Sequence, residues 1–163
     1  MRTSFTLLLS FLFLSVFSQS ADESGVMKVV NQVFEAMRTS DSTLLKDAFI
    51  ESPTTYTVFK NPQGETQFRI GEFQKFKDAV GSEKTDVWNE PIWNEKVEID
   101  GPLASVWVDY AFYVNDKFSH CGVDAFHLVN VDGQWKIFHL VDTRRKADCD
   151  VPDEVKKKYE GDK

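Results

Sequence analysis

The chain has 163 residues, which is enough for one domain of ordinary size and too short for two comfortable ones. It carries 26 acidic and 19 basic side chains, and the net charge of −7 argues against a general nucleic-acid-binding protein, which needs a positive field. Apolar residues make up 42% and aromatic residues 13% of the chain, so a packed core is expected and global disorder is excluded. Two cysteines are too few for a disulfide scaffold or a four-thiolate zinc site.

The first 20 residues have the layout of a secretory signal peptide. Arg2 supplies the positive start, a short apolar run follows, and Ser20 is a small residue suited to cleavage before Ala21. An uncleaved membrane anchor is the alternative, but the apolar run is short for a bilayer span. We therefore expect a secreted or periplasmic protein that is not membrane-bound after cleavage. Its predicted parts are a signal peptide over 1–20, a single domain over 21–147 and a charged tail over 148–163.

The two cysteines are the only possible disulfide pair in an exported chain. A bond between Cys121 and Cys149 would close a loop of about 29 residues and stabilise the fold by about 3–4 kcal/mol in the chain-entropy model. It would attach the tail to a central strand. Two free thiols, or a reactive thiol at Cys121, are the alternatives.

Helical and strand patterns alternate in the N-terminal half of the domain. Apolar side chains at spacings of three and four predict a long first helix, and Asp41 or Ser42 is suited to cap a second, shorter one. A β-branched and aromatic run after Pro53 predicts a strand, which a turn joins to a return strand. The predicted helices cover residues 24–38, 42–49 and 72–80, and the two strands cover 54–59 and 66–70.

The C-terminal half of the domain has the pattern of a strand meander. Tight turns at 100–102, 115–116 and 132–133 separate long strands over 87–99, 103–114, 118–131 and 134–143. Helices followed by a long antiparallel sheet predict an α+β fold, with the N-terminal helices packed on a strongly curved antiparallel sheet. A sheet curved over helices leaves a conical space, which is a natural ligand pocket.

A resemblance becomes specific in the third long strand and the turn after it. His120, Gly122, Asp124 and Phe126 precede an Asp-Gly turn and then the segment Trp135–Ile137. In this order the chain resembles the nuclear transport factor 2-like, or SnoaL-like, superfamily, and within it the secreted branch labelled "putative lumazine-binding". The resemblance implies a cystatin-like cone fold and a homodimer formed through one sheet face. It does not imply one activity, because the superfamily includes isomerases, dehydratases, cyclases and non-catalytic binding proteins.

Counting register from the tight turns predicts which polar side chains meet on one sheet face. Asp109 and His120 become diagonal neighbours across one hairpin, and Asp124 and His139 across the next. An aspartate that orients an imidazole makes a general base, so His120 with Asp109 or Asp124 is the candidate catalytic group. A slip of one residue in either hairpin would scatter this set.

The same face is expected to carry the walls of a pocket for a small hydrophobic or aromatic ligand. Its candidate ligand-binding residues are Trp107, Tyr113, Phe126, Trp135 and His139. Core packing, a dimer contact or the rim of the pocket would each suit Trp88 and Trp93. Three functions remain open: a small-molecule-binding protein, a cofactor-free isomerase, cyclase or dehydratase, and a dimerisation or interaction module. We expect no cofactor and no metal site, since His127 lies on the opposite predicted face and the other ligands come from separate strands.

Overall fold

The structure, a computed structural model, describes the backbone of residues 7–160 and the side chains of residues 22–160. The helices are α1 (Leu7–Thr39), α2 (Ser42–Ala48), α3 (Phe73–Gly81) and α4 (Asp153–Glu160). The strands are β1 (Phe49–Lys60), β2 (Thr66–Ile70), β3 (Trp88–Asn89), β4 (Ile92–Asp100), β5 (Leu103–Val114), β6 (Lys117–Val131) and β7 (Gln134–Arg144). The α+β class and the order of elements expected from the sequence are confirmed.

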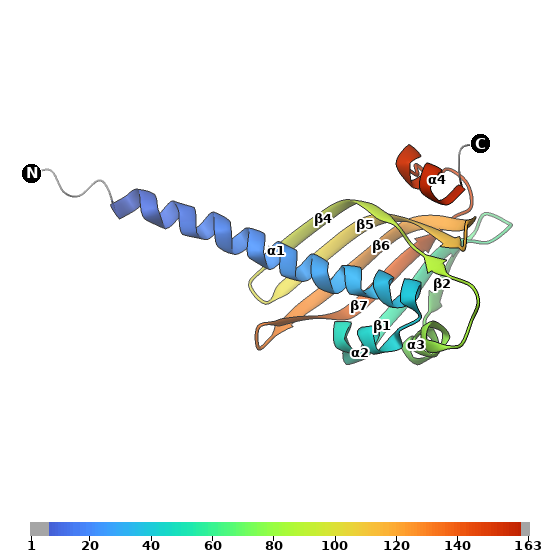
Figure 1. The fold of residues 1–163 in the computed structure, drawn as a ribbon, viewed down its shortest axis with the longest axis horizontal. Helices are drawn as coiled ribbons and strands as arrows, with labels where there is room; N and C mark the ends of the chain where they lie inside the picture. The colour runs from blue at the N-terminus through green and yellow to red at the C-terminus, as the bar shows by residue number, and fades with distance from the viewer. Residues whose placement is uncertain (1–6, 161–163) are drawn as a thin grey trace, which may run out of the picture.

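The strands form one curved sheet in the order β2-β1-β7-β6-β5-β3, and β4 also pairs with β5 (Figure 1). Strands β4 to β7 make the expected antiparallel meander. The sheet is mixed, however, because β1 lies parallel to β7. After β1 the chain forms β2, then α3, and then the meander. The last strand of the meander, β7, therefore lies beside β1, the first strand of the sheet.

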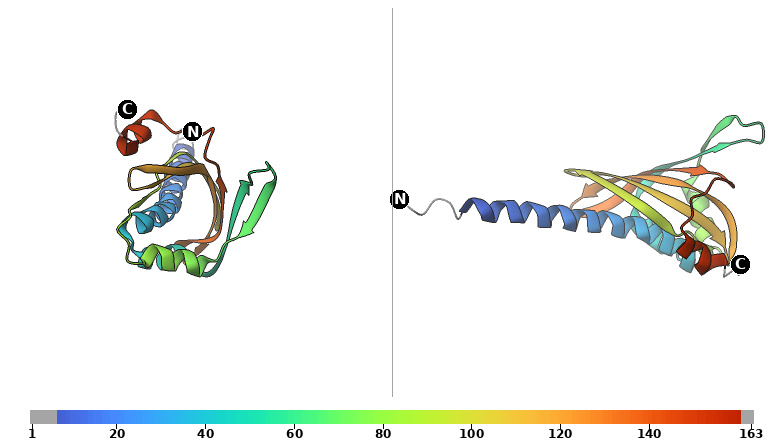
Figure 2. Two further views of the ribbon diagram at one scale, coloured as in Figure 1. Left: turned by 90° about the vertical axis from the view of Figure 1, so that its right-hand side faces the viewer. Right: turned by 90° about the horizontal axis from the view of Figure 1, so that it is seen from above.

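Helix α1 lies in the concave side of the sheet (Figure 2). Its contact face consists of Val26, Val30 and Val33, one helical turn apart, each at most 2% exposed. They pack on inward-facing residues of β5, β6 and β7, such as Val108 and Leu128. The N-terminal part of α1 extends beyond the sheet (Figure 1).

The signal peptide stays a prediction. Residues 1–6 lie outside the described part of the chain, and the side chains of residues 7–21 are not described either. Within the described residues, no helix has the length and apolar character needed to cross a membrane.

The single strand predicted over 87–99 is in fact two strands, β3 and β4. They are separated at Glu90 and Pro91. Proline has no N–H to give to a sheet ladder, so the strand is interrupted there, and the Pro91 carbonyl instead accepts a hydrogen bond from the Ala111 N–H at 3.2 Å. Glu90 therefore belongs to neither strand, and the direction of its side chain does not follow the alternation of a regular strand.

The C-terminal tail folds back on the outer side of the sheet. Cys121 and Cys149 form a disulfide, as predicted, and their Cα atoms are 6.0 Å apart. Next to it the Tyr159 ring of α4 stacks on Tyr113, with 4.9 Å between ring centroids. Val151 is buried in the same small cluster, so the tail is packed and not merely tethered.

Two β-bulges make the sheet register differ from the one predicted. In the β5–β6 pair, Phe112 lies opposite His120 whereas Tyr113 lies opposite Phe118, so Ser119 is an extra residue. In the β6–β7 pair, His127 lies opposite His139 whereas Leu128 lies opposite Ile137, so residue 138 is extra. Beyond each bulge the pairing is shifted by one residue. Side chains that were predicted to share a sheet face across the two strands therefore lie on opposite faces.

Candidate functional site

A cavity of about 340 Å³ lies between the concave face of the sheet and helices α1 and α3. Every long strand of the meander except β4 contributes to its lining, together with β1 and the Trp88–Glu90 segment. Most of the lining is aromatic or aliphatic. The aromatic residues of its walls include Phe34, Phe76, Trp88, Tyr110, Phe112 and Phe126.

Three of the residues predicted for the site line this cavity. His120, Asp124 and Phe126 all point inward from β6. Asp124 is 4% exposed, and Phe126 is buried with its ring edge-on to Phe34 at 6.1 Å between centroids. Their inward direction follows from their common parity on a single strand, which a bulge elsewhere does not alter.

The predicted Asp–His pairs do not form. Asp109 lies on the outer face, where it accepts a hydrogen bond from the Asn94 side-chain amide at 2.8 Å, and His120 lies inside. His139 also lies outside, where its Nδ1 contacts the Thr54 hydroxyl at 2.8 Å, and Asp124 lies inside. The physical reason is the two bulges, since each shifts the partner strand by one residue and turns the partner side chain outward.

The remaining predicted ligand-binding residues also lie away from the cavity. Trp107 is on the outer face and is 49% exposed. Tyr113 is fully buried beneath the C-terminal tail. Trp135 is buried in the main core, close to Gly25 of α1.

Glu90 and Asp124 form a carboxyl pair at the polar end of the cavity. Their side chains are hydrogen-bonded to each other, which requires a proton between them. Burial raises the pKa of Glu90 from 4.5 to about 7, and the negative charge of Asp142 adds to this while the hydrogen bond from Asp124 opposes it. Burial and the neighbouring charge of Glu90 raise the pKa of Asp124 well above its ordinary value. Asp124 is therefore the protonated partner and donates to Glu90.

Asp142 and Arg144 form an ion pair on β7, beside the carboxyl pair. The Arg144 Nε atom is 2.5 Å from Oδ2 of Asp142, and the Thr57 hydroxyl donates to Oδ1 of Asp142 at 2.6 Å. The Arg144 side chain is 51% exposed, so the pair connects the cavity to solvent. Burial would lower the pKa of the Arg144 guanidinium, but the hydrogen bond and charge of Asp142 outweigh it and raise that pKa.

His120 and Tyr110 complete the polar end of the cavity, and both are uncharged. Burial, together with the positive charge of Arg144, lowers the pKa of His120 to about 4, so the imidazole is neutral at physiological pH. The Tyr110 hydroxyl donates to the Thr143 carbonyl at 2.8 Å, and burial raises the pKa of Tyr110. A neutral imidazole can accept or donate a proton, but no described carboxylate orients it: its Nδ1 contacts the Ser119 hydroxyl at 3.0 Å.

Gly122 lets the strands approach closely at this end of the cavity. A Cβ atom there would lie 1.8 Å from the Thr143 carbonyl oxygen and 2.8 Å from the Tyr110 ring. Gly122 lies opposite Tyr110 in the β5–β6 pair. The absence of a side chain at Gly122 leaves room for the Thr143 carbonyl, which accepts the hydrogen bond from the Tyr110 hydroxyl.

Sequence reasoning missed Glu90, Asp142, Arg144 and Tyr110. One signal was available: Asp142 and Arg144 are two residues apart on a strand, so they share a face and form a pair of opposite charges. Glu90 offered no such signal, because its direction depends on the break at Pro91. Among the described residues, no group of three or more histidine, cysteine, aspartate or glutamate side chains could hold a metal ion.

Comparison with known proteins gives a family and a fold. The family described as "Putative lumazine-binding" matches residues 21–141. A nuclear transport factor 2-like protein of unknown function from Shewanella baltica has a similar structure, with 18% identity, a TM-score of 0.59, and coverage of 78% of this chain and 97% of that one. No curated protein matches the chain.

Two further solved structures have the same fold. A protein of unknown function from Mycobacterium tuberculosis is 15% identical with a TM-score of 0.65, covering 86% of this chain and 82% of that one. A nuclear transport factor 2-like protein from Streptomyces avermitilis, described as a "putative dehydratase", is 13% identical with a TM-score of 0.59, covering 79% of this chain and 99% of that one. At these identities the likeness shows the fold alone.

Proposed function

The chain belongs to the family described as "Putative lumazine-binding", and on this premise we propose that it is an exported protein that binds a small aromatic or apolar molecule in the cavity beneath its curved sheet. The cavity is the observation that carries the proposal. Its size of about 340 Å³ lies at the lower end of the range for small-molecule sites, and aromatic walls with a few convergent polar groups are typical of such sites.

Two observations support export. The first 20 residues have the layout of a signal peptide. Cys121 and Cys149 form a disulfide, a bond that persists in secreted and periplasmic proteins and is rare in the cytosol. Mass spectrometry of the protein from its own host would show an N-terminus near Ala21 and a mass lower than that of the dithiol form by two hydrogen atoms.

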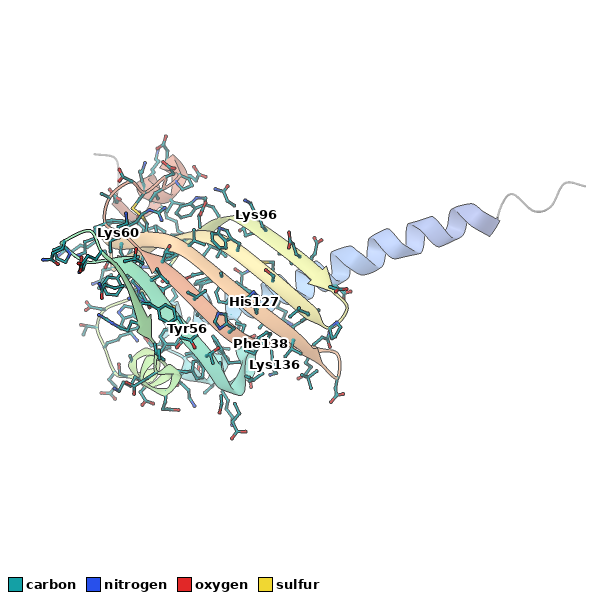
Figure 3. All side chains as sticks on the ribbon, turned by 180° about the vertical axis from the view of Figure 1, so that it is seen from behind. Tyr56, Lys60, Lys96, His127, Lys136 and Phe138 are labelled. Carbon is teal, nitrogen blue, oxygen red and sulfur yellow. A yellow bond between two sulfur atoms is a disulfide. The ribbon has the colours of Figure 1, made fainter. Side chains whose placement is uncertain are left out.

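The convex face of the sheet supports a homodimer. Figure 3 views this face from the side opposite α1, and Tyr56, His127 and Phe138 lie across it. Trp107 on the same face is 49% exposed, which is typical of a contact surface and unfavourable in bulk water. Sedimentation velocity tests the proposal: wild type should sediment as a dimer and Trp107→Glu as a monomer.

Cofactor-free acid–base catalysis is a second candidate, and the Glu90–Asp124 pair is the observation that favours it. One carboxyl group holds a proton and its partner lacks one, so the pair offers an acid and a base within a single cavity. His120 is neutral beside them. If a ligand that co-purifies with the protein is converted by wild type and only bound by Asp124→Asn, the protein is an enzyme; unchanged ligand with wild type contradicts catalysis.

Native mass spectrometry of protein purified from its own host gives the first test of binding, because a co-purifying small molecule would identify the ligand. A second test uses N-phenyl-1-naphthylamine, a neutral probe whose fluorescence rises in apolar surroundings. Leu140 lines the cavity, and the next residue, Val141, lies on the outer face opposite Ala125. Leu140→Trp fills the cavity and should weaken binding by at least about tenfold, whereas Val141→Trp should not.

The matched tryptophan variants separate cavity binding from surface adhesion. Thermal denaturation must first show that both variants are folded. Equal affinities for Leu140→Trp and Val141→Trp, or no saturable binding by wild type, would contradict a ligand site in the cavity.

A further inference from the structure

The charges around the cavity are not evenly compensated. Arg144 is the only lysine or arginine among the described residues that line it. Its guanidinium Nε is already bonded to Asp142 at 2.5 Å, and the second oxygen of Asp142 accepts from Thr57 at 2.6 Å. Arg144 and Asp142 therefore neutralise each other.

The Glu90–Asp124 pair must share Arg144 with Asp142, which holds the guanidinium in a direct ion pair. The other titratable groups that face this pair are Tyr110 on β5 and His120 on β6, and both are neutral at physiological pH. Glu72, just before α3, also lines the cavity, but it is bonded to Lys75 at 2.6 Å and is mostly exposed. The polar end of the cavity thus holds two carboxyl groups that are joined only by a proton.

The walls of the cavity suit a flat ring that carries a positive charge. Aromatic faces attract cations as well as stacked rings. Trp88 already interacts with a cation in this way, since the Lys84 Nζ atom lies 4.4 Å from its ring centroid. Phe112 and Phe126 line the cavity on neighbouring strands near the carboxyl pair.

We propose that the cavity selects a small planar ring compound with a protonated nitrogen group, such as an aromatic amidine or a cationic nitrogen heterocycle, and that the Glu90–Asp124 pair recognises that group. The proposal rests on the ligand-binding function proposed above and names the ligand class. The cavity and its walls define the site, and the carboxyl pair defines the charge that the site accepts. The ligand's N–H groups replace the proton between the two carboxyl groups, and that proton passes to the buffer.

This mode of binding excludes ligands that carry a negative charge on the ring. A carboxylate on the same ring would face the two carboxyl groups at the polar end of a mostly apolar cavity, which is strongly unfavourable. A neutral amide would bind through its ring alone, with weaker hydrogen bonds than a charged donor makes.

Three probes of one shape and different charge test the proposal: 2-naphthamidine, 2-naphthamide and 2-naphthoate. For wild type at pH 7 we expect the amidine to bind at least about tenfold more tightly than the amide, which matches the gain from charge-assisted hydrogen bonds, and the naphthoate to bind most weakly. Glu90→Gln and Asp124→Asn should each remove most of this preference. Asp109→Asn is the matched control, because its carboxylate lies on the outer face, bonded to Asn94.

Calorimetry supplies an independent readout of the exchanged proton. Titrations of the amidine in phosphate and in Tris, whose ionisation enthalpies differ, should show protons released on binding by wild type and not by Asp124→Asn, which lacks the carboxyl group that carries the exchanged proton. Proton release should be absent with the amide for both proteins.

The proposal is wrong if the naphthoate or the amide binds as tightly as the amidine, or if Glu90→Gln keeps the preference. It is also wrong if the amidine does not bind while N-phenyl-1-naphthylamine binds wild type and not Leu140→Trp. That last result would leave the ligand-binding function intact, so the two proposals fail separately.

Discussion

Replacing Glu90 by glutamine tests the electrostatics of the cavity without any ligand. Burial is the main reason that the pKa of Glu90 rises from 4.5 to about 7. Between these pH values the folded protein keeps a proton that the unfolded chain releases. The free energy of unfolding therefore falls as the pH rises through this window. At 1.36 kcal/mol per pKa unit, the ionisation of Glu90 makes the free energy of unfolding about 3 kcal/mol lower above pH 7 than at pH 4.5.

Glutamine has nearly the same shape and cannot ionise, so the variant escapes this loss. We expect the stability of Glu90→Gln relative to wild type to increase by about 3 kcal/mol between pH 4.5 and pH 7.5. Urea denaturation followed by tryptophan fluorescence at four pH values measures this difference. Because both proteins retain His120, its titration cancels in the comparison.

The matched control is Glu98→Gln, whose carboxylate is exposed on β4 and loses little hydration on folding. Its stability relative to wild type should be nearly independent of pH. If the advantage of Glu90→Gln were constant across the range, or decreased as the pH rises, the half-buried Glu90 carboxyl would not be paired with Asp124.

Three further outcomes follow from the structure. Gly122→Ala should destabilise the fold by about 3 kcal/mol or more in urea denaturation, since its Cβ would meet the Thr143 carbonyl oxygen at 1.8 Å; an effect below about 1 kcal/mol contradicts that close approach. Reducing the disulfide between Cys121 and Cys149, which lie 28 positions apart in the sequence, should cost about 3–4 kcal/mol, measured as the shift in denaturation midpoint with and without reductant. The imidazole of His120 should titrate near pH 4 by NMR, and its contribution to stability should be lost as the pH falls from 6.5 through about 4; a midpoint above 6 would contradict its burial.

The local pattern of the sequence determined the elements and their order. Spacings of three and four gave α1 its buried face, and the tight turns set the bounds of β5 at Leu103 and Val114 as predicted. The return strand β2 also has its predicted bounds. Short-range patterns suffice for these features, because helix periodicity and turn chemistry act within a few residues. The disulfide was predicted from the presence of a single cysteine pair in a chain expected to be exported.

Only the tertiary structure decided which polar groups meet. Residues on a single strand keep their relative faces, so His120 and Asp124 were correctly placed together. Residues on neighbouring strands were paired by counting outward from the turns. This count cannot reveal the extra residue of a bulge, because the alternation of apolar and polar residues on either side of a bulge is unchanged. The two bulges turned Asp109 and His139 outward. The break at Pro91 and the parallel pairing of β1 with β7 then placed Glu90 and the Asp142–Arg144 pair at the polar end of the cavity, through contacts between segments far apart in the chain.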